Sequence, residues 1–239
     1  ATGPRRADLI AVGLIFETDF PDVAVGFLSD SIAPKAYAYL LIKDGRATIG
    51  TCLRRDFKQS EQYLQRAIEW IGSLYPMQIR NERQFGGYGN FYARPSCRID
   101  NRLYVGECAG FQDALWGFGM RYAIQSAYLA ARSLIDGTDY DALWKCDLAP
   151  RHRTSFVNRF LWEKFGERGY RRVVRTLQST PDAAARVRRE VNSSVWKTML
   201  FPLVNRWVED LSRKLACHEP GCVCIWCQCE HGEVAETHV

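Results

Sequence analysis

The sequence predicts a protein of the α/β (α+β) class, in which a strand-rich part comes first and a helical part follows. Two observations support this class: strand-like patterns dominate the first 110 or so residues, and helical spacing prevails after Gly119. A glycine-rich connection joins the two parts, and a cysteine-rich tail occupies 217–239. Because 47% of the 239 residues are hydrophobic, the chain can bury a sizeable core.

The strand-rich part begins with a continuous apolar run, LIAVGLIFE over 9–17, which is typical of a buried strand. Residues 23–28 form a second candidate strand. A hairpin is expected over 37–53, because alternating apolar residues lead into Asp44-Gly45, a strong turn signal, and then return.

Helical spacing of apolar residues predicts a helix over 59–74, which Pro76 ends. Two further strands are expected over 77–92, and a short buried strand over 102–106.

The helical part starts after Gly119 and its first helix ends at Asp136-Gly137. Further helices are expected over 140–165, 168–177, 181–191 and 203–215, with Pro202 breaking or kinking the chain before the last of them. The first helix is amphipathic, with an apolar stripe formed by Met120, Ala123, Ile124, Ala127, Ala130, Ala131 and Leu134.

The connection between the two parts, VGECAGFQDALWGFGM over 105–120, contains four glycines and an acid after an apolar strand. Glycine lets backbone amides approach phosphate oxygens, and a helix that begins near Gly117 would direct its free N–H groups at that anion. Glu107 could then accept a hydrogen bond from a sugar hydroxyl. The spacing suits a dinucleotide, and an ordinary turn with positive φ explains the glycines equally well.

This stretch resembles the second flavin-contacting motif of the geranylgeranyl reductase family, FAD-dependent oxidoreductases of the p-hydroxybenzoate hydroxylase type. The family pattern is close to G-D-A-A-G-x-x-x-P-x-x-G-x-G-I, followed by a helix with A-x-x-S. Glu107 replaces the aspartate of the family, and Ala114 stands where proline is common. The matching positions are Gly106, Ala109, Gly110, Gly117, Gly119, Ala123 and Ser126.

Two other segments resemble the same family. The segment APKAYAYLLIKDGRATIGTCL is similar to the P-x-x-Y-x-W-x-F-P hairpin that covers the family's substrate cavity, with Tyr39 in place of tryptophan. The opening ATGPRRAD is similar to the end of a motif near the flavin phosphates. The resemblance implies that Tyr37 and Tyr39 contact substrate. It implies that FAD is bound by Thr2, Gly3, Gly106, Glu107, Gly110, Gly117, Phe118, Gly119 and Met120.

For the architecture, the resemblance implies a partial FAD/NAD(P)-binding Rossmann-like domain over 1–135, with an antiparallel substrate sheet inserted at about 8–100. A basic helical region over 136–216 and a Cys/His-rich tail over 217–239 would follow. The family's first motif, G-x-G-x-x-G, does not occur in the sequence. The chain therefore resembles the C-terminal portion of a flavoprotein, and alone it is expected to bind FAD poorly or not at all.

The activity that the resemblance implies is reduction of carbon–carbon double bonds in a hydrophobic isoprenoid or lipid-like substrate, with NAD(P)H as the candidate electron donor. A flavoprotein monooxygenase and an electron-transfer flavoprotein-type dehydrogenase remain alternatives, as do a metal-binding module and an inactive fragment. No residue stands out as a catalytic proton donor. Tyr37, Tyr39 and Cys52 are candidates on the hairpin, and for them packing is the simpler interpretation.

Five of the nine cysteines crowd between 217 and 229, in the spacing C-x4-C-x-C-x2-C-x-C. Thiolates so close together suit Zn²⁺ or an iron–sulfur cluster. One ligand set is Cys222, Cys224, Cys227 and Cys229; another is Cys217, Cys222, Cys227 and His231. A tail of free thiols is the alternative.

Basic charge is concentrated in one segment, because residues 150–216 carry 15 Lys or Arg and 6 Asp or Glu. The segment VWKTMLFPLVNRW within it combines apolar residues, tryptophans and cations, which predicts contact with a membrane surface as an alternative to packing. A nucleic-acid-binding role would leave the first 135 residues unexplained, so no nucleic acid is expected. No apolar run approaches the ~20 residues of a membrane-spanning helix, and we expect a cytoplasmic protein with a candidate peripheral site on the inner membrane face. The sequence indicates no oligomeric state.

Overall fold

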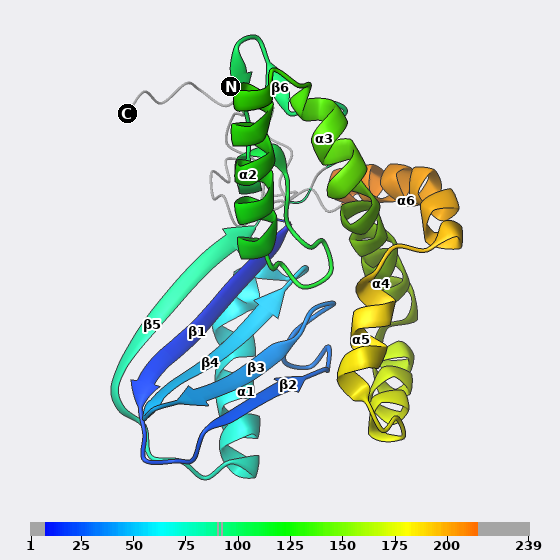
Figure 1. The fold of residues 1–239 in the computed structure, drawn as a ribbon. Helices are drawn as coiled ribbons and strands as arrows, with labels where there is room; N and C mark the ends of the chain where they lie inside the picture. The colour runs from blue at the N-terminus through cyan, green and yellow to red at the C-terminus, as the bar shows by residue number, and fades with distance from the viewer. Residues whose placement is uncertain (1–7, 90, 92, 215–239) are drawn as a thin grey trace, which may run out of the picture.

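The computed structural model describes residues 8–89, 91 and 93–214, and the side chains up to residue 207. This part of the chain contains an antiparallel five-stranded sheet in the order β2-β3-β4-β1-β5, with one helix behind it and the remaining helices at its side and upper edge (Figure 1). The strands are β1 (Leu9–Glu17), β2 (Val23–Phe27), β3 (Ala38–Lys43), β4 (Arg46–Leu53) and β5 (Arg80–Gly89).

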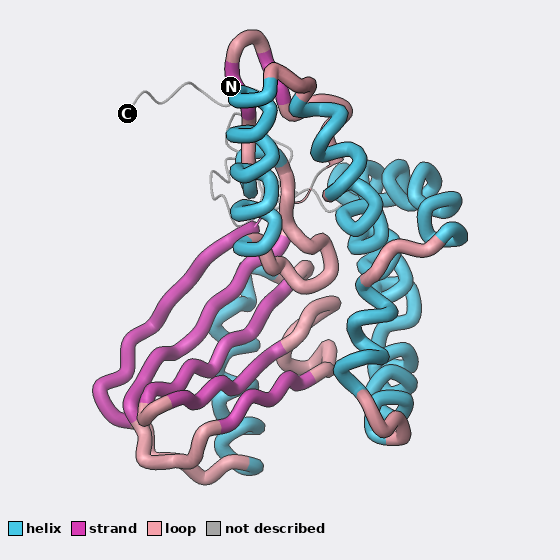
Figure 2. The backbone as a smooth tube through the Cα atoms, viewed as in Figure 1, coloured by secondary structure: helices cyan, strands magenta, loops and turns pink. Residues whose placement is uncertain are grey.

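A second, two-stranded sheet pairs β6 (Arg98–Ile99) with β7 (Arg102–Leu103), and it is followed in the chain by a mostly helical part (Figure 2). The short 3-10 helices are η1 (Phe57–Gln59) and η2 (Gly106–Ala109). The α-helices are α1 (Ser60–Leu74), α2 (Met120–Asp136), α3 (Tyr140–Asp147), α4 (Ala149–Gln178), α5 (Ala183–Val191) and α6 (Val195–Lys214).

The hairpin and the first helix form as predicted. β3 and β4 pair from Ala38 opposite Thr51 to Lys43 opposite Arg46, around a turn in which Asp44 and Gly45 both have positive φ. Helix α1 then packs on one face of the sheet. Its buried Ala67 and Ile71 join a core contributed by alternate residues of the strands: Leu14, Phe16, Leu40, Ile42, Ala47 and Ile49.

The opposite face of the sheet has a different composition. Gly13 of β1 lies between Gly50 of β4 and Phe85 of β5, and Gly50 is also paired with Tyr39 of β3. A Cβ atom added at Gly50 would overlap the Tyr39 ring, and one added at Gly13 would overlap the Phe85 ring. Each aromatic ring therefore lies directly over a glycine of the neighbouring strand, which makes this face flat and apolar.

Two strand predictions are wrong. Where two strands were expected over 77–92, there is one, β5 (Arg80–Gly89), because it pairs along β1 and keeps Gly86 and Gly87 in register opposite Val12 and Ala11. The buried strand predicted over 102–106 is reduced to the two residues of β7, neither of which is buried. Gly106 has φ 57°, which ends the extended conformation and starts η2.

The later helices differ from prediction in two details. The helix predicted over 140–165 is divided into α3 and α4 at Leu148. The boundary predicted between 165 and 168 is confirmed, because Gly166 has non-helical φ and ψ at the point where α4 continues to Gln178. Pro202 lies inside α6 instead of ending a helix before it. Within the described residues, no helix has both the length and the apolarity that crossing a membrane requires.

Helix α2 has the predicted bounds, and Gly137 ends it in the left-handed conformation. Its buried side, however, consists of Tyr122, Ser126, Leu129, Ala130 and Ser133. The apolar stripe noted in the sequence is mostly exposed: Met120 is 85% exposed, Ile124 72% and Leu134 75%. An amphipathic pattern predicts that the apolar stripe of a helix is its buried side, but α2 buries a different side.

Gly13 and Gly26 provide a matched test of the flat sheet face. An alanine at Gly13 would place its Cβ against the Ile49 carbonyl oxygen as well as the Phe85 ring, whereas nothing lies within 4 Å of a Cβ at Gly26. We expect Gly13→Ala to lower the free energy of unfolding by about 1–3 kcal/mol, and Gly26→Ala to raise it by about 0.5–1 kcal/mol. Urea denaturation measures both, and equal effects would contradict the packing of Phe85 over Gly13.

Candidate functional site

The glycine-rich connection runs from β7 through η2 and a loop over 110–119 to the start of α2. Gly106, Gly110 and Gly117 have φ values of 57°, 79° and 75°, which side chains with a Cβ rarely adopt. A Cβ on Gly117 would also lie 2.8 Å from Leu9 Cδ2. The conformation of the turn therefore accounts for these three glycines. Gly119 differs, because its φ is −110°.

The loop is held first by one of its own residues. The Asp113 carboxylate accepts hydrogen bonds from the backbone N–H groups of Leu115 (3.0 Å) and Trp116 (2.8 Å). The Asp113 carbonyl accepts from Gly117 N at 2.8 Å, and its N–H donates to the Phe118 carbonyl at 3.0 Å. Burial raises the pKa of Asp113, and the two amide donors oppose that rise by stabilising the carboxylate.

The loop is also held by Arg54, the first residue after β4. Its side chain is almost wholly buried, and Nη2 donates to the carbonyl oxygens of Ala114 and, at 2.7 Å, Leu115. Burial, and to a smaller extent the nearby Arg159, lower the pKa of this guanidinium to about 9. Among the described residues, Nε and Nη1 have no hydrogen-bond partner, so the loop carbonyls are the acceptors that fix the group.

Tyr37 forms a second link between the sheet and the loop. Its hydroxyl donates to the Trp116 carbonyl at 2.6 Å, and its ring centroid lies 5.3 Å from that of Trp116, 6.5 Å from Phe118 and 6.2 Å from Tyr39. Burial raises the pKa of Tyr37, and it raises that of Tyr39 to about 12. The two residues predicted to contact substrate thus lie beside Phe118, which was predicted to contact the cofactor.

Helix α4 holds the loop from its other side. Ser155 Oγ accepts from the Ala114 N–H at 2.9 Å, and all of these atoms are buried. One turn earlier, the buried His152 packs edge-to-face on Phe111, Tyr122 and Phe156, with centroids 5.1–5.8 Å apart. Burial lowers the pKa of His152 to about 4, so this imidazole is neutral in the folded protein at neutral pH.

The loop ends at the N-terminus of α2, where the structure shows a helix start without a side-chain cap. Gly119 occupies the N-cap position, and the first turn contains no acidic residue. Phe118 and Met120 flank this point and are 65% and 85% exposed. The helix is fixed to the turn by Ser126, whose Oγ accepts from Gly106 N at 2.9 Å.

These features fit part of a flavin. An uncapped helix N-terminus offers N–H groups and a positive dipole end to an electron-rich carbonyl or a phosphate, and the exposed Phe118 offers an aromatic surface beside it. Glu107 is exposed on η2, and the positions of Gly106, Gly110 and Gly117 are explained by the turn itself. Thr2 and Gly3 lie outside the described residues.

The metal ligands predicted in the tail, Cys217, Cys222, Cys224, Cys227, Cys229 and His231, also lie outside the described residues. Within the described part of the chain, no group of three or more His, Cys, Asp or Glu side chains is placed to hold a metal ion.

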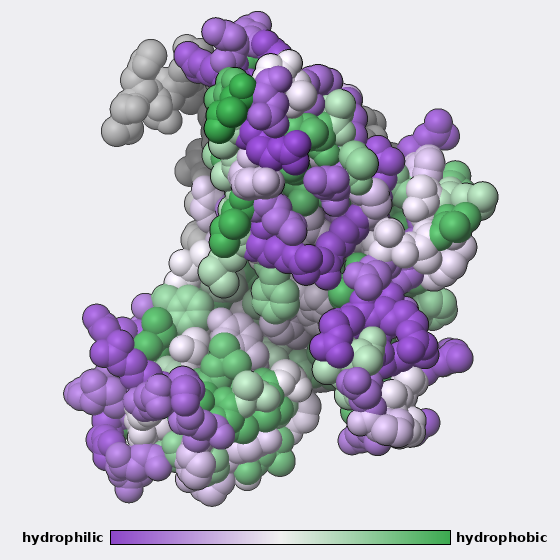
Figure 3. All heavy atoms as spheres, viewed as in Figure 1, coloured by the Kyte–Doolittle hydropathy of each residue, from purple (hydrophilic) through white to green (hydrophobic). Residues whose placement is uncertain are grey.

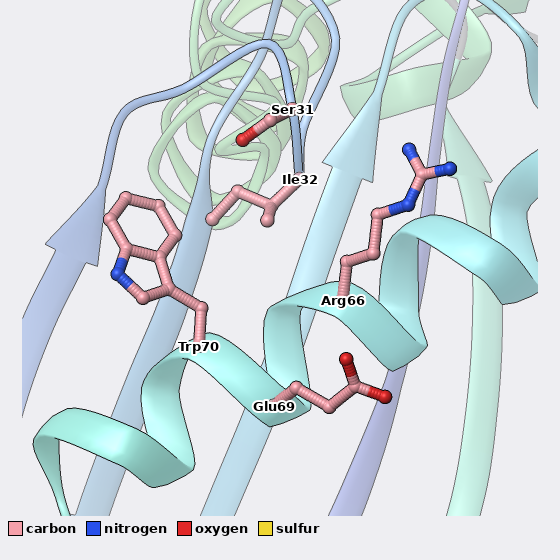
Figure 4. Close-up of a pocket in the computed structure, with 5 residues that line it drawn as sticks. All are labelled: Ser31, Ile32, Arg66, Glu69 and Trp70. Carbon is pink, nitrogen blue, oxygen red and sulfur yellow. The ribbon is translucent and has the colours of Figure 1, made fainter.

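Sequence reasoning missed Arg54, Asp113 and Ser155, which hold the loop in place. Only Arg54 gave a signal, because a cation directly follows the buried end of a strand. A shallow pocket of about 450 Å³ between α1 and the segment after β2 contains no predicted site residue (Figure 4). Its lining residues are Ser31, Ile32, Arg66, Glu69 and Trp70.

Beside the loop, the flat face of the sheet borders a hollow that α4 and α5 close on the other side (Figure 3). On this face of the sheet, Ile15 and Leu41 are 41% and 47% exposed. Both are paired with Thr48, so they lie in one row of the face that carries Gly13, Gly50 and Tyr39. Arg83 of β5, the other partner of Ile15, lies at the edge of this row. Through Tyr39 and Tyr37 the face continues to the aromatic ring of Phe118.

The fold is shared with a geranylgeranyl bacteriochlorophyll reductase-like protein from Thermoplasma acidophilum. The two structures superpose with a TM-score of 0.59 at 20% sequence identity, over 86% of this chain and 55% of that one. The flavin-dependent halogenase CmlS matches with a TM-score of 0.49 and 16% identity, over 89% of this chain and 48% of that one. A flavin-dependent brominase, Bmp2, gives 0.49 and 12%, over 89% and 57%.

The chain thus spans about half the length of these solved structures. No protein-family model matches the sequence, and neither does any curated protein. At these identities the similarity establishes the fold, including the antiparallel sheet and the helices beside it.

The pH dependence of folding tests the burial of His152 beside the loop. The folded pKa of about 4 lies below the ordinary value of 6.5, so the unfolded chain takes up a proton first as the pH falls. The contribution of His152 to the free energy of unfolding is therefore fully present above pH 6.5. It is lost as the pH falls toward 4, which lowers the free energy of unfolding by about 3 kcal/mol in all.

We expect His152→Phe, which keeps an aromatic ring in the cluster, to remove this part of the pH dependence. Unfolding free energies of the two proteins between pH 7 and pH 4 measure it. Carboxyl groups such as Asp113 titrate in both proteins and cancel in the difference. Parallel pH profiles would show that His152 is not buried in its neutral form.

Proposed function

We propose that this chain is part of an FAD-dependent oxidoreductase, with the flavin bound against the loop over 110–119 and the start of α2. The observation that carries the proposal is the uncapped N-terminus of α2 beside the exposed Phe118. It is supported by a fold shared with a geranylgeranyl bacteriochlorophyll reductase-like protein. When bound, the flavin supplies hydride transfer, and the protein supplies position and environment.

The exposed stripe of α2 supports the view that further polypeptide completes the flavin site. Five large apolar side chains on this helix are 62–85% exposed, and Ala127 and Ala131 between them leave room for a close approach. The solved neighbour contains structure beyond the part that this chain matches. The stripe consists of Met120, Ile124, Tyr128, Leu134 and Ile135.

For the reaction, we propose reduction of a carbon–carbon double bond in an isoprenoid or similar lipid-like substrate. The flat sheet face is the observation that favours a long apolar substrate. Aromatic rings lie over Gly13 and Gly50, and no charged residue of β1 or β4 pairs with either glycine. Such a chain would extend from the exposed Ile15 and Leu41 toward Tyr37 and Phe118.

Three side chains of the site hold their protons at neutral pH. Burial raises the pKa of Tyr37 and Tyr39, and it raises that of the Cys52 thiol to about 11. The Tyr37 proton is engaged by the Trp116 carbonyl. Tyr37 therefore positions the loop, and the three neutral groups keep the substrate side of the site free of negative charge.

Two glycine substitutions test the proposal in an extended protein, in which this chain is joined to a segment that supplies the rest of the neighbour's fold. Gly119→Asp places a carboxylate at the start of α2, where it would repel the electron-rich edge of the flavin. Gly119 has an ordinary φ, and a Cβ there would lie 3.3 Å from Gln112 Cγ, so the fold is retained with a small shift. Gly72→Asp, on the exposed surface of α1, is the matched control.

We expect the extended protein and Gly72→Asp to bind FAD and to purify yellow. Gly119→Asp should weaken FAD binding about a hundredfold, because one charge-assisted contact is lost and a repulsive one is gained. Its unfolding temperature should be unchanged. Absorbance and fluorescence titrations with FAD measure the affinity. An extended protein that cannot be reconstituted, or a Gly119→Asp variant that binds FAD normally, would contradict the proposed site.

A further inference from the structure

Helix α6 has two apolar sides, and only one of them packs against the protein. On the inner side, Phe201 meets Phe156 of α4 with ring centroids 6.0 Å apart, and Trp207 meets Phe160 at 4.8 Å. Val204 is buried between these contacts. The aromatic residues Trp162 and Tyr170 of α4 are likewise buried. Packing therefore accounts for much of the segment that the sequence placed at a membrane surface.

The outer side of α6 remains open. Val195 is 73% exposed, Trp196 52%, Met199 75% and Leu203 64%. The spacing of these residues puts them on one stripe of the helix, opposite the side that contacts α4. In Figure 3 this helix lies at the right edge of the molecule, where hydrophobic residues stand beside neutral and hydrophilic ones. We call these four residues the α6 stripe.

Exposed arginines flank the α6 stripe. Arg188 and Arg189 lie in the last turn of α5, directly before α6, and Arg206 lies on α6 one turn beyond Leu203. All three are exposed. Two acids lie nearby: Glu190 is engaged by Arg186 at 3.0 Å and Lys197 at 3.6 Å, and Asp182 lies 3.9 Å from Arg188. Residues 182–206 carry five Lys or Arg and two Asp or Glu, so basic charge is in excess.

Lys197 fixes the geometry of this patch. Its ammonium is buried and donates to the Glu190 carbonyl at 2.6 Å, which joins the end of α5 to the start of α6. The same ammonium lies 5.4 Å from the Trp196 ring centre, which orients the indole. The arginines of α5 and the α6 stripe are therefore held on one rigid unit.

We propose that the α6 stripe, together with Arg188, Arg189 and Arg206, docks on a membrane surface that contains anionic phospholipids. Apolar side chains with a tryptophan would enter the boundary of the acyl chains, and the arginines would contact phosphates. A symmetric contact between two copies is disfavoured, because it would bring the arginines of both copies together. This inference is independent of the proposed flavin site.

The test is flotation of the full chain with phosphatidylcholine vesicles, with or without phosphatidylglycerol. We expect binding only with phosphatidylglycerol, and a decrease with added salt. Replacing both Arg188 and Arg189 by Gln should weaken binding about 25-fold, since each arginine near an anionic surface contributes about fivefold. Met199→Glu should weaken it by about tenfold or more, because a carboxylate would enter the apolar boundary.

Leu74→Glu is the matched control, because Leu74 is 54% exposed at the end of α1 and belongs to neither the α6 stripe nor the proposed flavin site. It should bind vesicles as the unaltered chain does. Brominated lipids provide a second readout: they should quench tryptophan fluorescence in the unaltered chain, and much less in Trp196→Phe. Far-ultraviolet circular dichroism verifies that each variant is folded.

Three outcomes would overturn the proposal. Equal recovery with neutral, anionic and no vesicles would show that the α6 stripe binds no lipid. Equal loss in Leu74→Glu and Met199→Glu would show unspecific apolar adsorption. A dimer in sedimentation equilibrium that Met199→Glu dissociates, without any vesicle binding, would assign the stripe to a second copy of the chain. None of these results depends on whether FAD is bound.

Discussion

The buried guanidinium of Arg54 is the interaction on which the candidate site depends. It joins the end of a central strand to the carbonyls of Ala114 and Leu115, in a loop that has no regular secondary structure of its own. Burying a cation is costly unless acceptors surround it, and a charge-assisted hydrogen bond contributes more than a neutral one. The loop supplies those acceptors, so loop and strand end stabilise each other.

The surroundings of Arg54 extend this coupling to α4. Arg54 and Arg159 lie 5.1 and 5.8 Å from the centre of the Phe91 ring, and Arg159 donates to Glu163 at 2.9 Å within a buried pair. Burial raises the pKa of Asp8 nearby, and both arginines oppose that rise. The sheet, the loop and α4 thus meet at one group of buried arginines and carboxylates. Attraction between these opposite charges holds the three elements together and so fixes the positions of Phe118 and the start of α2.

The sequence predicted those features that depend on local geometry. Asp44-Gly45 specified the hairpin, the spacing before Leu74 specified α1, and Gly137 specified the end of α2, because turn and capping conformations are set by neighbouring residues. The glycine connection was also placed correctly between the last short strand and α2. What the local pattern could not decide was which side of α2 is buried, since that depends on partners distant in sequence.

The support of the loop was unpredictable for the same reason. The hydrogen bond between Ala114 and Ser155 joins residues 41 positions apart, and that between Tyr37 and Trp116 joins residues 79 positions apart. Neither has a sequence signature. The division of the apolar residues of α6 between an inner and an outer side likewise follows from its contact with α4, which composition alone does not contain.

Amide hydrogen exchange in Arg54→Met tests most directly whether the buried guanidinium holds the loop. In this variant we expect faster exchange across 110–119, most of all at Leu115 and Trp116, and unchanged exchange in α1. The control is Arg66→Met, which replaces an exposed arginine of α1 and should leave exchange in the loop unchanged. Unchanged protection of the loop in Arg54→Met, or an equal loss throughout the chain, would contradict it.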